Sequence, residues 1–304
     1  MRICIFGAGA LGSALGGLLV NGNDVTLVGR KEHMKAIRRR GLVLTGDVRR
    51  IVKLEALETI DSARPADLLL ITTKAYDTLE AVDACRDWAA SGTQVLTLQN
   101  GLGNLEAIRK WKGEKAFGGT TTLGATMLSP GKVRISGLGR TSIGSDADPQ
   151  AAERIAGAFR ASGLLTSTVR DVRTEIWTKA VVSSCINPLT AILQVSNGIL
   201  LKAPWVSRLM DGILRECLAV AAEEGISLSD KAIRARVRTV LQDTAQNHSS
   251  MLQDIEKHRR TEIGQINGAF VGYGTAHGVA TPLNGILTAA IESMTTNLAN
   301  YAKG

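Results

Sequence analysis

The sequence has few of the features that mark a secreted, membrane-spanning or metal-binding protein. Its four cysteines, Cys4, Cys85, Cys185 and Cys217, form no CxxC pair and no cluster with histidine, so we expect buried free thiols and no metal site. No run of about 18 apolar residues occurs, and this predicts no membrane span. The chain opens directly on the strand-like residues 2–6, so we expect no signal peptide and a cytoplasmic location.

Aromatic residues are also scarce, at 4% of the 304 residues, while the net charge is +8. A positive charge suits nucleic acid, an anionic membrane surface or a small anionic ligand. The densest basic stretch, residues 38–50, contains arginines but no interleaved aromatic residue, so it lacks the stacking surfaces of single-strand binders. We therefore expect a small-molecule ligand and no nucleic-acid or membrane partner.

The length and the pattern of apolar residues predict two domains. Residues 1–120 alternate short apolar runs with helical patterns, an order typical of βαβ units and a parallel sheet. The expected strands are 3–6, 25–28, 67–72 and 94–98, and the expected helices are 11–20, 31–40 and 78–89. Residues 115–145 are expected to add antiparallel strands that complete this sheet.

From residue 171 onward the pattern is almost wholly helical. We expect helices at 171–187, 204–225, 230–241, 246–258, 262–277 and 283–299, with breakers at Pro188, Pro204, Gly225, Gly278 and Pro282. The predicted fold is an α/β N-terminal Rossmann-type dinucleotide-binding domain, residues 1–170, followed by an all-α C-terminal domain, residues 171–304. The amphipathic helices of the second half suit a homodimer interface as well as a core.

The segment from Gly7 to Gly12 carries a GxGxxG motif directly after a strand and at the opening of a helix. In that context Gly7 permits a tight turn, Gly9 lets a pyrophosphate approach the backbone, and Gly12 lets the helix pack closely. The free N–H groups of the helix N-terminus suit phosphate. We therefore predict dinucleotide binding by Gly7, Ala8, Gly9, Ala10, Leu11 and Gly12.

The end of the second strand discriminates between the two nicotinamide cofactors. NAD-specific sites usually have Asp or Glu there, whereas this chain has Gly29-Arg30-Lys31. A guanidinium can bind a 2′-phosphate with two parallel hydrogen bonds. The sequence therefore favours NADPH over NADH, with Arg30 as the residue that selects it.

Reduction of a carbonyl needs a proton donor beside the developing alkoxide. Lys179, Ser183 and Asn187 follow at i, i+4 and i+8, a spacing that puts them in one polar line on a helix. The residues between them are mainly small or apolar. On spacing alone, an extended lysine and a capping asparagine explain the same pattern.

Several further motifs resemble those of the ketopantoate reductase (2-dehydropantoate 2-reductase) family. They are Gly7–Gly12, Lys74, Gln99-Asn100-Gly101-Leu102-Gly103, Lys179 with Asn187-Pro188-Leu189-Thr190-Ala191, Ser249–Asp254, Arg259–Ile263 and Ile266-Asn267-Gly268. The resemblance covers nearly the whole chain in order. It implies a Rossmann domain, a helical second domain and NADPH-dependent reduction of 2-dehydropantoate to pantoate, a step towards pantothenate and coenzyme A.

The resemblance also implies roles for individual residues. Lys179 would be the general acid, Glu262 would orient its ammonium and contact the cofactor, and Asn100 would contact both cofactor and substrate. Lys74 and Ala125 would contact the cofactor, and the remaining substrate contacts would be Ser183, Asn187, Asn197 and Ser250, with Asp254 in a supporting place. Taken singly, each of two residues also has an explanation without a site role: Glu262 as an acid favoured at a helix N-terminus, and Ser250 as a solvated helix residue.

The chain departs from the family pattern at one position. Ser183 stands where the family usually has an asparagine, and its shorter hydroxyl has less reach. This puts the identity of the substrate in question more than the type of reaction. Two alternatives therefore stay open: a paralogous NADPH-dependent reductase of another 2-oxo acid, and a non-catalytic NADPH sensor.

Overall fold

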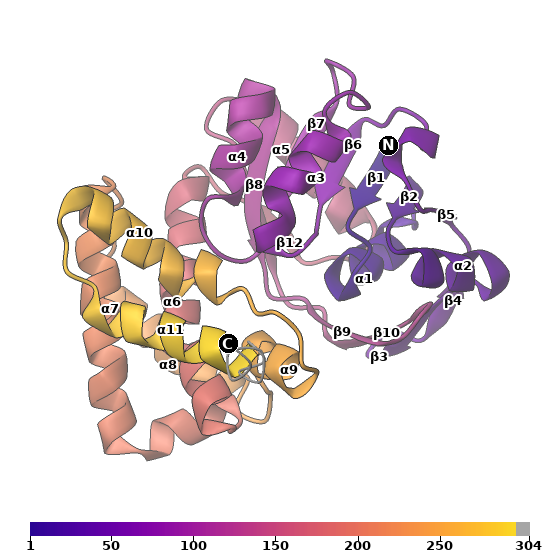
Figure 1. The fold of residues 1–304 in the computed structure, drawn as a ribbon. Coiled ribbons are helices and arrows are strands. Elements are labelled where there is room, and N and C mark those ends of the chain that lie inside the picture. The colour runs from indigo at the N-terminus through magenta and orange to yellow at the C-terminus, as the bar shows by residue number, and fades with distance from the viewer. Residues whose placement is uncertain (296–304) are drawn as a thin grey trace, which may run out of the picture. The chain divides into compact units, whose positions relative to one another are not determined.

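The computed structural model describes residues 1–295, and they form two compact units (Figure 1). The first unit consists of Met1–Gln99 and Gly103–Glu175, and the second of Asn100–Leu102 and the chain from Ile176 onward. The predicted fold class, α/β followed by all-α, is confirmed. Residues Asn100–Leu102, from the middle of the α/β half, belong to the helical unit. A single domain boundary near residue 170 does not account for this segment.

A large, mostly parallel sheet forms the centre of the first unit. Its strands are β1 (Arg2–Phe6), β2 (Asp24–Val28), β5 (Glu55–Leu57), β6 (Leu68–Ile71), β7 (Gln94–Thr97), β8 (Ala116–Thr121), β11 (Thr141–Gly144) and β12 (Thr166–Thr168). Their order is β12-β11-β8-β7-β6-β1-β2-β5, and all neighbours are parallel except β11 and β8. The four strands expected before residue 100 are therefore present, with their carboxyl ends at one edge.

Residues 115–145 do not simply complete this sheet with antiparallel strands, so that prediction was wrong. β8 pairs in parallel with β7, and only β11 runs antiparallel to its neighbour β8. The hairpin β9 (Gly124–Ser129) and β10 (Lys132–Gly137) joins β3 (Leu42–Gly46) and β4 (Arg50–Val52) in a second sheet, of order β4-β3-β10-β9. The buried side chains of β3 and β10, such as Leu44 and Val133, give this second sheet an apolar face of its own.

Five helices accompany the two sheets of the first unit. They are α1 (Ala10–Leu19), α2 (Lys31–Arg40), α3 (Thr78–Cys85), α4 (Asn104–Lys112) and α5 (Pro149–Ala161), with 3-10 turns η1 (Ile60–Ser62), η2 (Ala75–Asp77) and η3 (Gly113–Lys115). Sequence patterning identified neither α4 nor α5; the N-terminus of α5 is capped by Asp148 (2.8 Å to the Ala151 N–H).

Helix α1 lies between the two sheets, and its glycines explain how it fits. A Cβ on Gly16 would lie 2.6 Å from the Leu27 side chain of the large sheet, and a Cβ on Gly17 would lie 2.9 Å from Leu44 of the small one. The helix is therefore buried on both sides from Gly12 to Leu19. This close packing fixes the position of its N-terminus.

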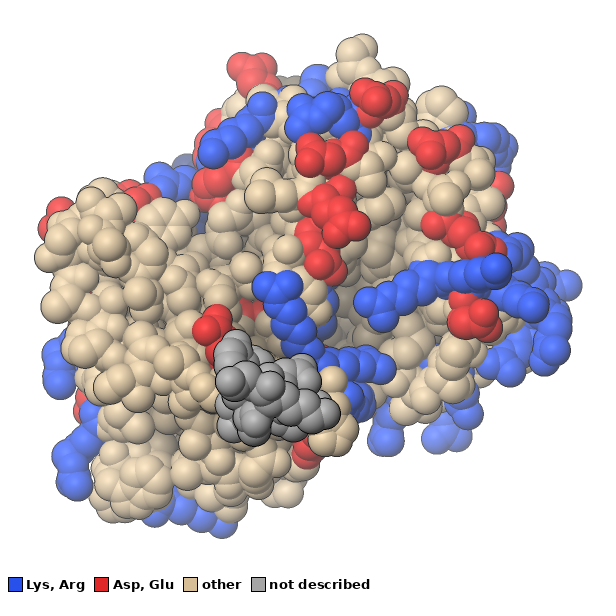
Figure 2. All heavy atoms as spheres, viewed as in Figure 1, with Lys and Arg blue, Asp and Glu red and all other residues tan. Residues whose placement is uncertain are grey.

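Arginines of the basic stretch contribute to the same packing. Arg50 donates to the Gly17 carbonyl at the end of α1 (2.6 Å), and Arg38 donates to the Ala56 carbonyl (2.9 Å) and to Glu58 (2.7 Å). Figure 2 shows Lys and Arg side chains gathered where Figure 1 places α2 and β4. Part of the positive charge of this stretch is therefore used within the fold.

The second unit is helical throughout its described residues. Its elements are α6 (Val172–Leu193), η4 (Asn197–Lys202), α7 (Pro204–Glu223), α8 (Asp230–Asp243), α9 (Ser250–Glu256), η5 (Ile263–Gln265), α10 (Asn267–His277) and α11 (Pro282–Thr295). Trp177 and Phe270 meet edge to face in its core, with ring centroids 5.6 Å apart. The helix expected at 262–277 is interrupted between η5 and α10, and residues 296–299 of the last expected helix lie outside the described residues.

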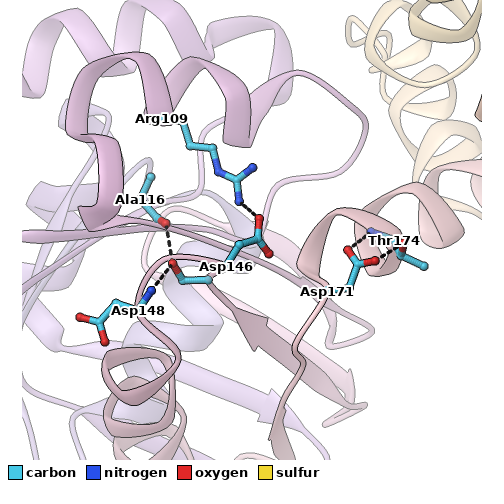
Figure 3. Close-up of polar contacts among 7 residues, drawn as sticks. Arg109, Ala116, Asp146, Asp148, Asp171 and Thr174 are labelled. Carbon is cyan, nitrogen blue, oxygen red and sulfur yellow. Dashed lines mark hydrogen bonds and ion pairs between the residues drawn. The ribbon is translucent and has the colours of Figure 1, made fainter. Parts of the chain in front are cut away.

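Helix α6 begins at a capping residue and continues through a proline. Asp171 accepts hydrogen bonds from the Thr174 N–H (2.9 Å) and hydroxyl (2.6 Å), as Figure 3 shows, and these bonds lower the pKa of its carboxyl. Pro188 does not end the helix, so that prediction was wrong. Proline cannot donate to the Ser184 carbonyl four residues earlier, but the Asn267 side chain donates to that carbonyl (3.2 Å).

Helix α6 is also the one helix among residues 1–295 long and apolar enough, by length and composition, to cross a membrane. In the most apolar window 61% of the residues are buried inside the structure, as in the core helix of a soluble protein, so the resemblance to a span is weak evidence.

The four cysteines are free and buried, as predicted.

Candidate active site

The turn after β1 packs against the ends of β2 and β6. The Gly7 and Ala8 N–H groups both donate to the Val28 carbonyl (3.0 and 2.9 Å). Gly7 has φ +97°, and a Cβ there would lie 2.4 Å from the Thr73 nitrogen, while a Cβ on Gly12 would lie 2.4 Å from the Thr72 hydroxyl. Both glycines are therefore required by the fold itself.

Gly9 differs, because no atom of residues 1–295 crowds it. A Cβ there would meet no atom closer than the Gly7 carbonyl oxygen at 3.8 Å. Gly9 is the N-cap of α1, no side chain caps this helix end, and its first turn, which begins with Ala10 and Leu11, contains no acidic residue. The turn thus presents backbone N–H groups and the positive end of a helix dipole without an internal anion, an arrangement that fits a phosphate group.

Three further residues predicted to bind the cofactor lie in the same unit, whereas Asn100 and Glu262 belong to the helical unit. Arg30 follows β2 as the N-cap of α2; it is exposed, and within residues 1–295 its side chain has no hydrogen bond or ion pair. Lys74 follows β6, is half-buried and is the N-cap of η2. Ala125 is half-buried in β9, where it pairs with Ile135 of the second sheet.

In the helical unit three predicted catalytic residues form a chain of hydrogen bonds. The Lys179 ammonium donates to Asn100 Oδ1 (2.8 Å), and Asn100 Nδ2 donates to Glu262 Oε2 (3.2 Å). The charges on the two sides fix the orientation of the amide, because reversing it would set its NH2 against the ammonium and its oxygen against the carboxylate. Glu262 is 6% exposed, whereas Lys179 and Asn100 are half-buried.

Backbone contacts hold Asn100 in this place. The Leu102 N–H donates to the Gln265 carbonyl (2.9 Å), and Gly101 has φ +82°. A Cβ on Gly101 would lie 2.3 Å from the same Gln265 carbonyl oxygen. The motif Asn100-Gly101-Leu102 is therefore fitted against η5, the turn that follows Glu262.

The polar line on α6 is present as predicted. Lys179, Ser183 and Asn187 are each partly exposed on a helix whose neighbouring positions are mostly buried. Within residues 1–295, the side chains of Ser183 and Asn187 have no hydrogen bond to the protein. They are therefore available to bind a ligand.

Ser250 lies next to the far end of this line. Its neighbour Ser249 caps α9, accepting from the Leu252 N–H (3.1 Å), and receives a hydrogen bond from Thr190 of α6 (2.8 Å). Thr190 lies about one turn beyond Asn187. Ser250 itself is exposed and its hydroxyl has no partner within the described residues.

The last two predicted substrate-site residues are more enclosed. Asn197 is 7% exposed; its Nδ2 donates to the Thr244 hydroxyl (2.8 Å), and its Oδ1 is buried with no hydrogen-bond partner within residues 1–295. Asp254 is 8% exposed in α9. Within residues 1–295 no three His, Cys, Asp or Glu side chains are grouped so that they could hold a metal ion.

Sequence reasoning gave no role to three buried residues that support these sites. Gln99 Nε2 donates to the Thr73 carbonyl (3.0 Å) and the Thr78 hydroxyl (2.9 Å), so it ties the loop before Lys74 to the end of β7. His33 bridges Ser13 of α1 (2.9 Å) and the Gly131 N–H (2.8 Å). The third residue is Asn267, which donates to the Ser184 carbonyl. Gln99 and Asn267 belong to motifs that resemble the family, so the sequence could have pointed to them, whereas no sequence pattern pointed to His33.

Comparisons with known proteins identify the family of this chain. The sequence model described as Ketopantoate reductase PanE/ApbA matches residues 3–148, and the one described as its C terminal matches residues 171–295. The 2-dehydropantoate 2-reductase of Pyrococcus horikoshii is 38% identical over 296 residues, which are 96% of this chain and 97% of that protein.

Two solved structures are also similar over nearly the whole chain. A PanE/ApbA family ketopantoate reductase from Ralstonia eutropha JMP134 has a TM-score of 0.90 at 32% identity, with 97% of this chain and 98% of that one covered. D-mandelate dehydrogenase with NADH and anilino(oxo)acetate has a TM-score of 0.92 at 31% identity and the same coverage. The resemblance read from the motifs is thus confirmed, and this chain belongs to the ketopantoate reductase family.

Proposed function

We propose that this protein is an NADPH-dependent 2-dehydropantoate 2-reductase, which reduces ketopantoate to (R)-pantoate for pantothenate and coenzyme A synthesis. The observation that carries the proposal is the chain Lys179–Asn100–Glu262, an ammonium held by an amide that a carboxylate orients. The relative from Pyrococcus horikoshii is named a 2-dehydropantoate 2-reductase, which supports the proposal.

In this proposal residues 1–170 form the NADP-binding domain. The uncrowded Gly9 and the uncapped start of α1 fit a pyrophosphate, and the partnerless guanidinium of Arg30 fits a 2′-phosphate. Ala8, Ala10, Leu11, Lys74, Ala125, Asn100 and Glu262 are the further proposed contacts. The bound NADPH supplies the hydride that reduces the ketone carbon.

Residues 171–304 form the substrate and catalytic domain. Lys179 acts as general acid: its ammonium carries three N–H donors, so while Asn100 holds it, it can also donate to a ketone oxygen. Charge develops on that oxygen as the carbonyl is reduced, and a proton from Lys179 neutralises it. Ser183, Asn187, Asn197 and Ser250 bind the polar groups of the substrate.

A panel of 2-oxo acids, each assayed with NADPH and with NADH, tests this function. Ketopantoate with NADPH is expected to give the highest kcat/KM. Absence of turnover with every 2-oxo acid would favour a non-catalytic NADPH sensor and would contradict the proposal.

A second candidate substrate has specific support. Ser183 stands where the family pattern implies a longer asparagine, and its hydroxyl has no partner within residues 1–295, so it is available to bind a different group. The similarity to D-mandelate dehydrogenase shows that this fold also carries a dehydrogenase of that name. A clear preference for another 2-oxo acid in the same panel would identify the protein as a paralogous reductase.

We also propose that the enzyme works in the cytoplasm as a homodimer, on a small-molecule substrate and without nucleic-acid or membrane partners. The exposed apolar side chains of Leu193, Ile199, Leu201 and Trp205 come from one stretch of the helical unit and suit a dimer interface. Sedimentation of the purified protein tests this. A monomer at assay concentrations would refute the dimer without affecting the proposed reaction.

A further inference from the structure

The helical unit contains a line of polar groups that runs from half-buried Glu216 through two fully buried asparagines to helix α6. Glu216 of α7 accepts from Asn284 Nδ2 (2.8 Å), and Asn284 Oδ1 accepts from Asn267 Nδ2 (2.9 Å). Asn267 Nδ2 also donates to the Ser184 carbonyl (3.2 Å). Asn267 and Asn284 are both 0% exposed.

The carboxylate at one end of this line fixes the direction of every bond in it. Ionised Glu216 can only accept, and it also accepts from the Leu283 and Asn284 N–H groups at the start of α11 (2.9 and 3.0 Å). Asn284 must therefore turn its NH2 to Glu216 and its oxygen to Asn267. Asn267 in turn presents its NH2 to both Asn284 and the Ser184 carbonyl.

Pro188 explains why α6 offers a carbonyl to an outside donor. Proline has no N–H to give to the carbonyl four residues earlier, which is that of Ser184. A buried carbonyl without a donor is destabilising, and the Asn267 amide supplies one. The opposite atom, Asn267 Oδ1, is buried without any hydrogen-bond partner in the described structure, which carries a desolvation cost.

Asn267 occupies a position that connects two parts of the proposed catalytic site. It directly follows the turn that begins at Glu262, whose carbonyl accepts from the Gln265 and Ile266 N–H groups (3.0 and 3.1 Å). Its partner Ser184 lies on α6, little more than one helical turn after Lys179. The Asn267 side chain therefore fastens the Glu262 turn to the helix that carries Lys179.

We propose that Asn267 is a positioning residue for proton transfer. It keeps the Glu262 turn at a fixed position relative to Lys179 by donating to the Ser184 carbonyl, which Pro188 leaves without a helical donor. The inference rests on the proposed function. A misplacement of about 1 Å at a catalytic group can lower turnover about 100-fold. Asn267 is thus expected to lower kcat by a larger factor than it weakens NADPH binding, since most of the proposed NADPH contacts lie in residues 1–170 and only Asn100 and Glu262 lie in the helical unit.

The test compares Asn267→Ala with the double variant Asn267→Ala/Pro188→Ala. The single variant is expected to lower kcat about 10- to 100-fold and to raise the Kd for NADPH by a smaller factor. In the double variant residue 188 regains its N–H, so the Ser184 carbonyl recovers a donor within the helix. Thermal stability should then return in part while kcat stays low, because the link to the Glu262 turn is still missing.

Two outcomes would overturn the proposal. One is wild-type kcat in a folded Asn267→Ala protein; the other is recovery of both Tm and kcat in the double variant, which would reduce Asn267 to a structural donor. If the single variant fails to fold, the kcat of the double variant alone decides: a low kcat supports the proposal and a wild-type kcat overturns it. Cys185→Ala is the matched control, because Cys185 is buried beside Ser184 on α6 but lies outside the amide line; it should lower Tm and keep kcat.

The inference can be judged separately from the substrate. The variants are assayed with whichever 2-oxo acid the wild-type protein reduces best, so a preference for an acid other than ketopantoate leaves the test intact. If the wild-type protein reduces none, hydrogen exchange replaces kcat. Amides of residues 262–266 should then exchange faster in both Asn267 variants than in wild type, and unchanged exchange would reject the role of Asn267.

Discussion

The turn at Gly7–Gly12 and the cluster around Lys179 differ in the chemical groups that form them. In the turn, backbone groups and missing side chains make the site, and every residue comes from one short segment. In the cluster, side chains make the site, and its members come from segments around residues 100, 179 and 262 that the fold brings together. A short motif can therefore specify the first site, whereas the second depends on the packing of a whole helical unit.

The largest expected effect separates chemistry from cofactor binding. Lys179→Ala removes the proposed general acid, so kcat should fall about 10²- to 10⁴-fold, while the Kd for NADPH measured by fluorescence titration stays near the wild-type value. Lys202→Ala, an exposed lysine of the same unit, is the control and should keep full turnover. Equal kcat in wild type and Lys179→Ala would end the proposed mechanism.

The two kinds of glycine in the turn give the next test. Gly7→Ala places a side chain 2.4 Å from the Thr73 nitrogen at φ +97°, and such a backbone alone costs about 1–3 kcal/mol, so Tm should fall by several degrees. Gly9→Ala meets no close atom, so Tm should hold while NADPH binds more weakly. Tm is read by calorimetry and the Kd by titration; the reverse pattern would contradict the assignment.

Arg30→Ala tests the choice of cofactor. Hydrogen bonds to charged groups contribute about 1.5–3 kcal/mol, so NADPH affinity should fall about 10- to 100-fold while NADH affinity hardly changes. Arg39→Ala, an exposed arginine on the same helix, is the control for net charge. An equal loss for both cofactors would show that Arg30 does not read the 2′-phosphate.

The smallest effect concerns pH and the support of α1. Burial lowers the pKa of His33, and because the Gly131 N–H donates to its Nδ1, the neutral ring donates from Nε2 to Ser13. The unfolded chain therefore takes up a proton at higher pH than the folded one. Stability should be complete above the ordinary histidine pKa of about 6.5 and fall as the pH drops below it, by at most about 1.4 kcal/mol per pH unit.

Urea titrations of wild type and His33→Gln at pH 7.5 and 5.5 measure this contribution. The variant should lose less stability than wild type between the two pH values. An identical loss in both proteins would assign the pH dependence to other groups.

Sequence patterning predicted what depends on local order. The strands of the parallel sheet, helix α2 with its bounds, and the polar line of α6 all follow from apolar spacing within one segment. The second sheet was missed because β3 and β10 are far apart in the chain and each is short. Pro188 misled because its effect depends on Asn267, whose side chain arrives from another helix and supplies the missing donor.

The excursion of Asn100–Leu102 into the helical unit has a consequence for dividing the protein. A fragment that starts at Ile176 would lack Asn100, the acceptor of the Lys179 ammonium, although it contains every helix from α7 to α11. Chimaeras that exchange the helical half between members of the family must therefore also exchange, or match, this tripeptide. A chimaera with a single crossover near residue 176 would combine Lys179 from one protein with the Asn100–Leu102 loop of another.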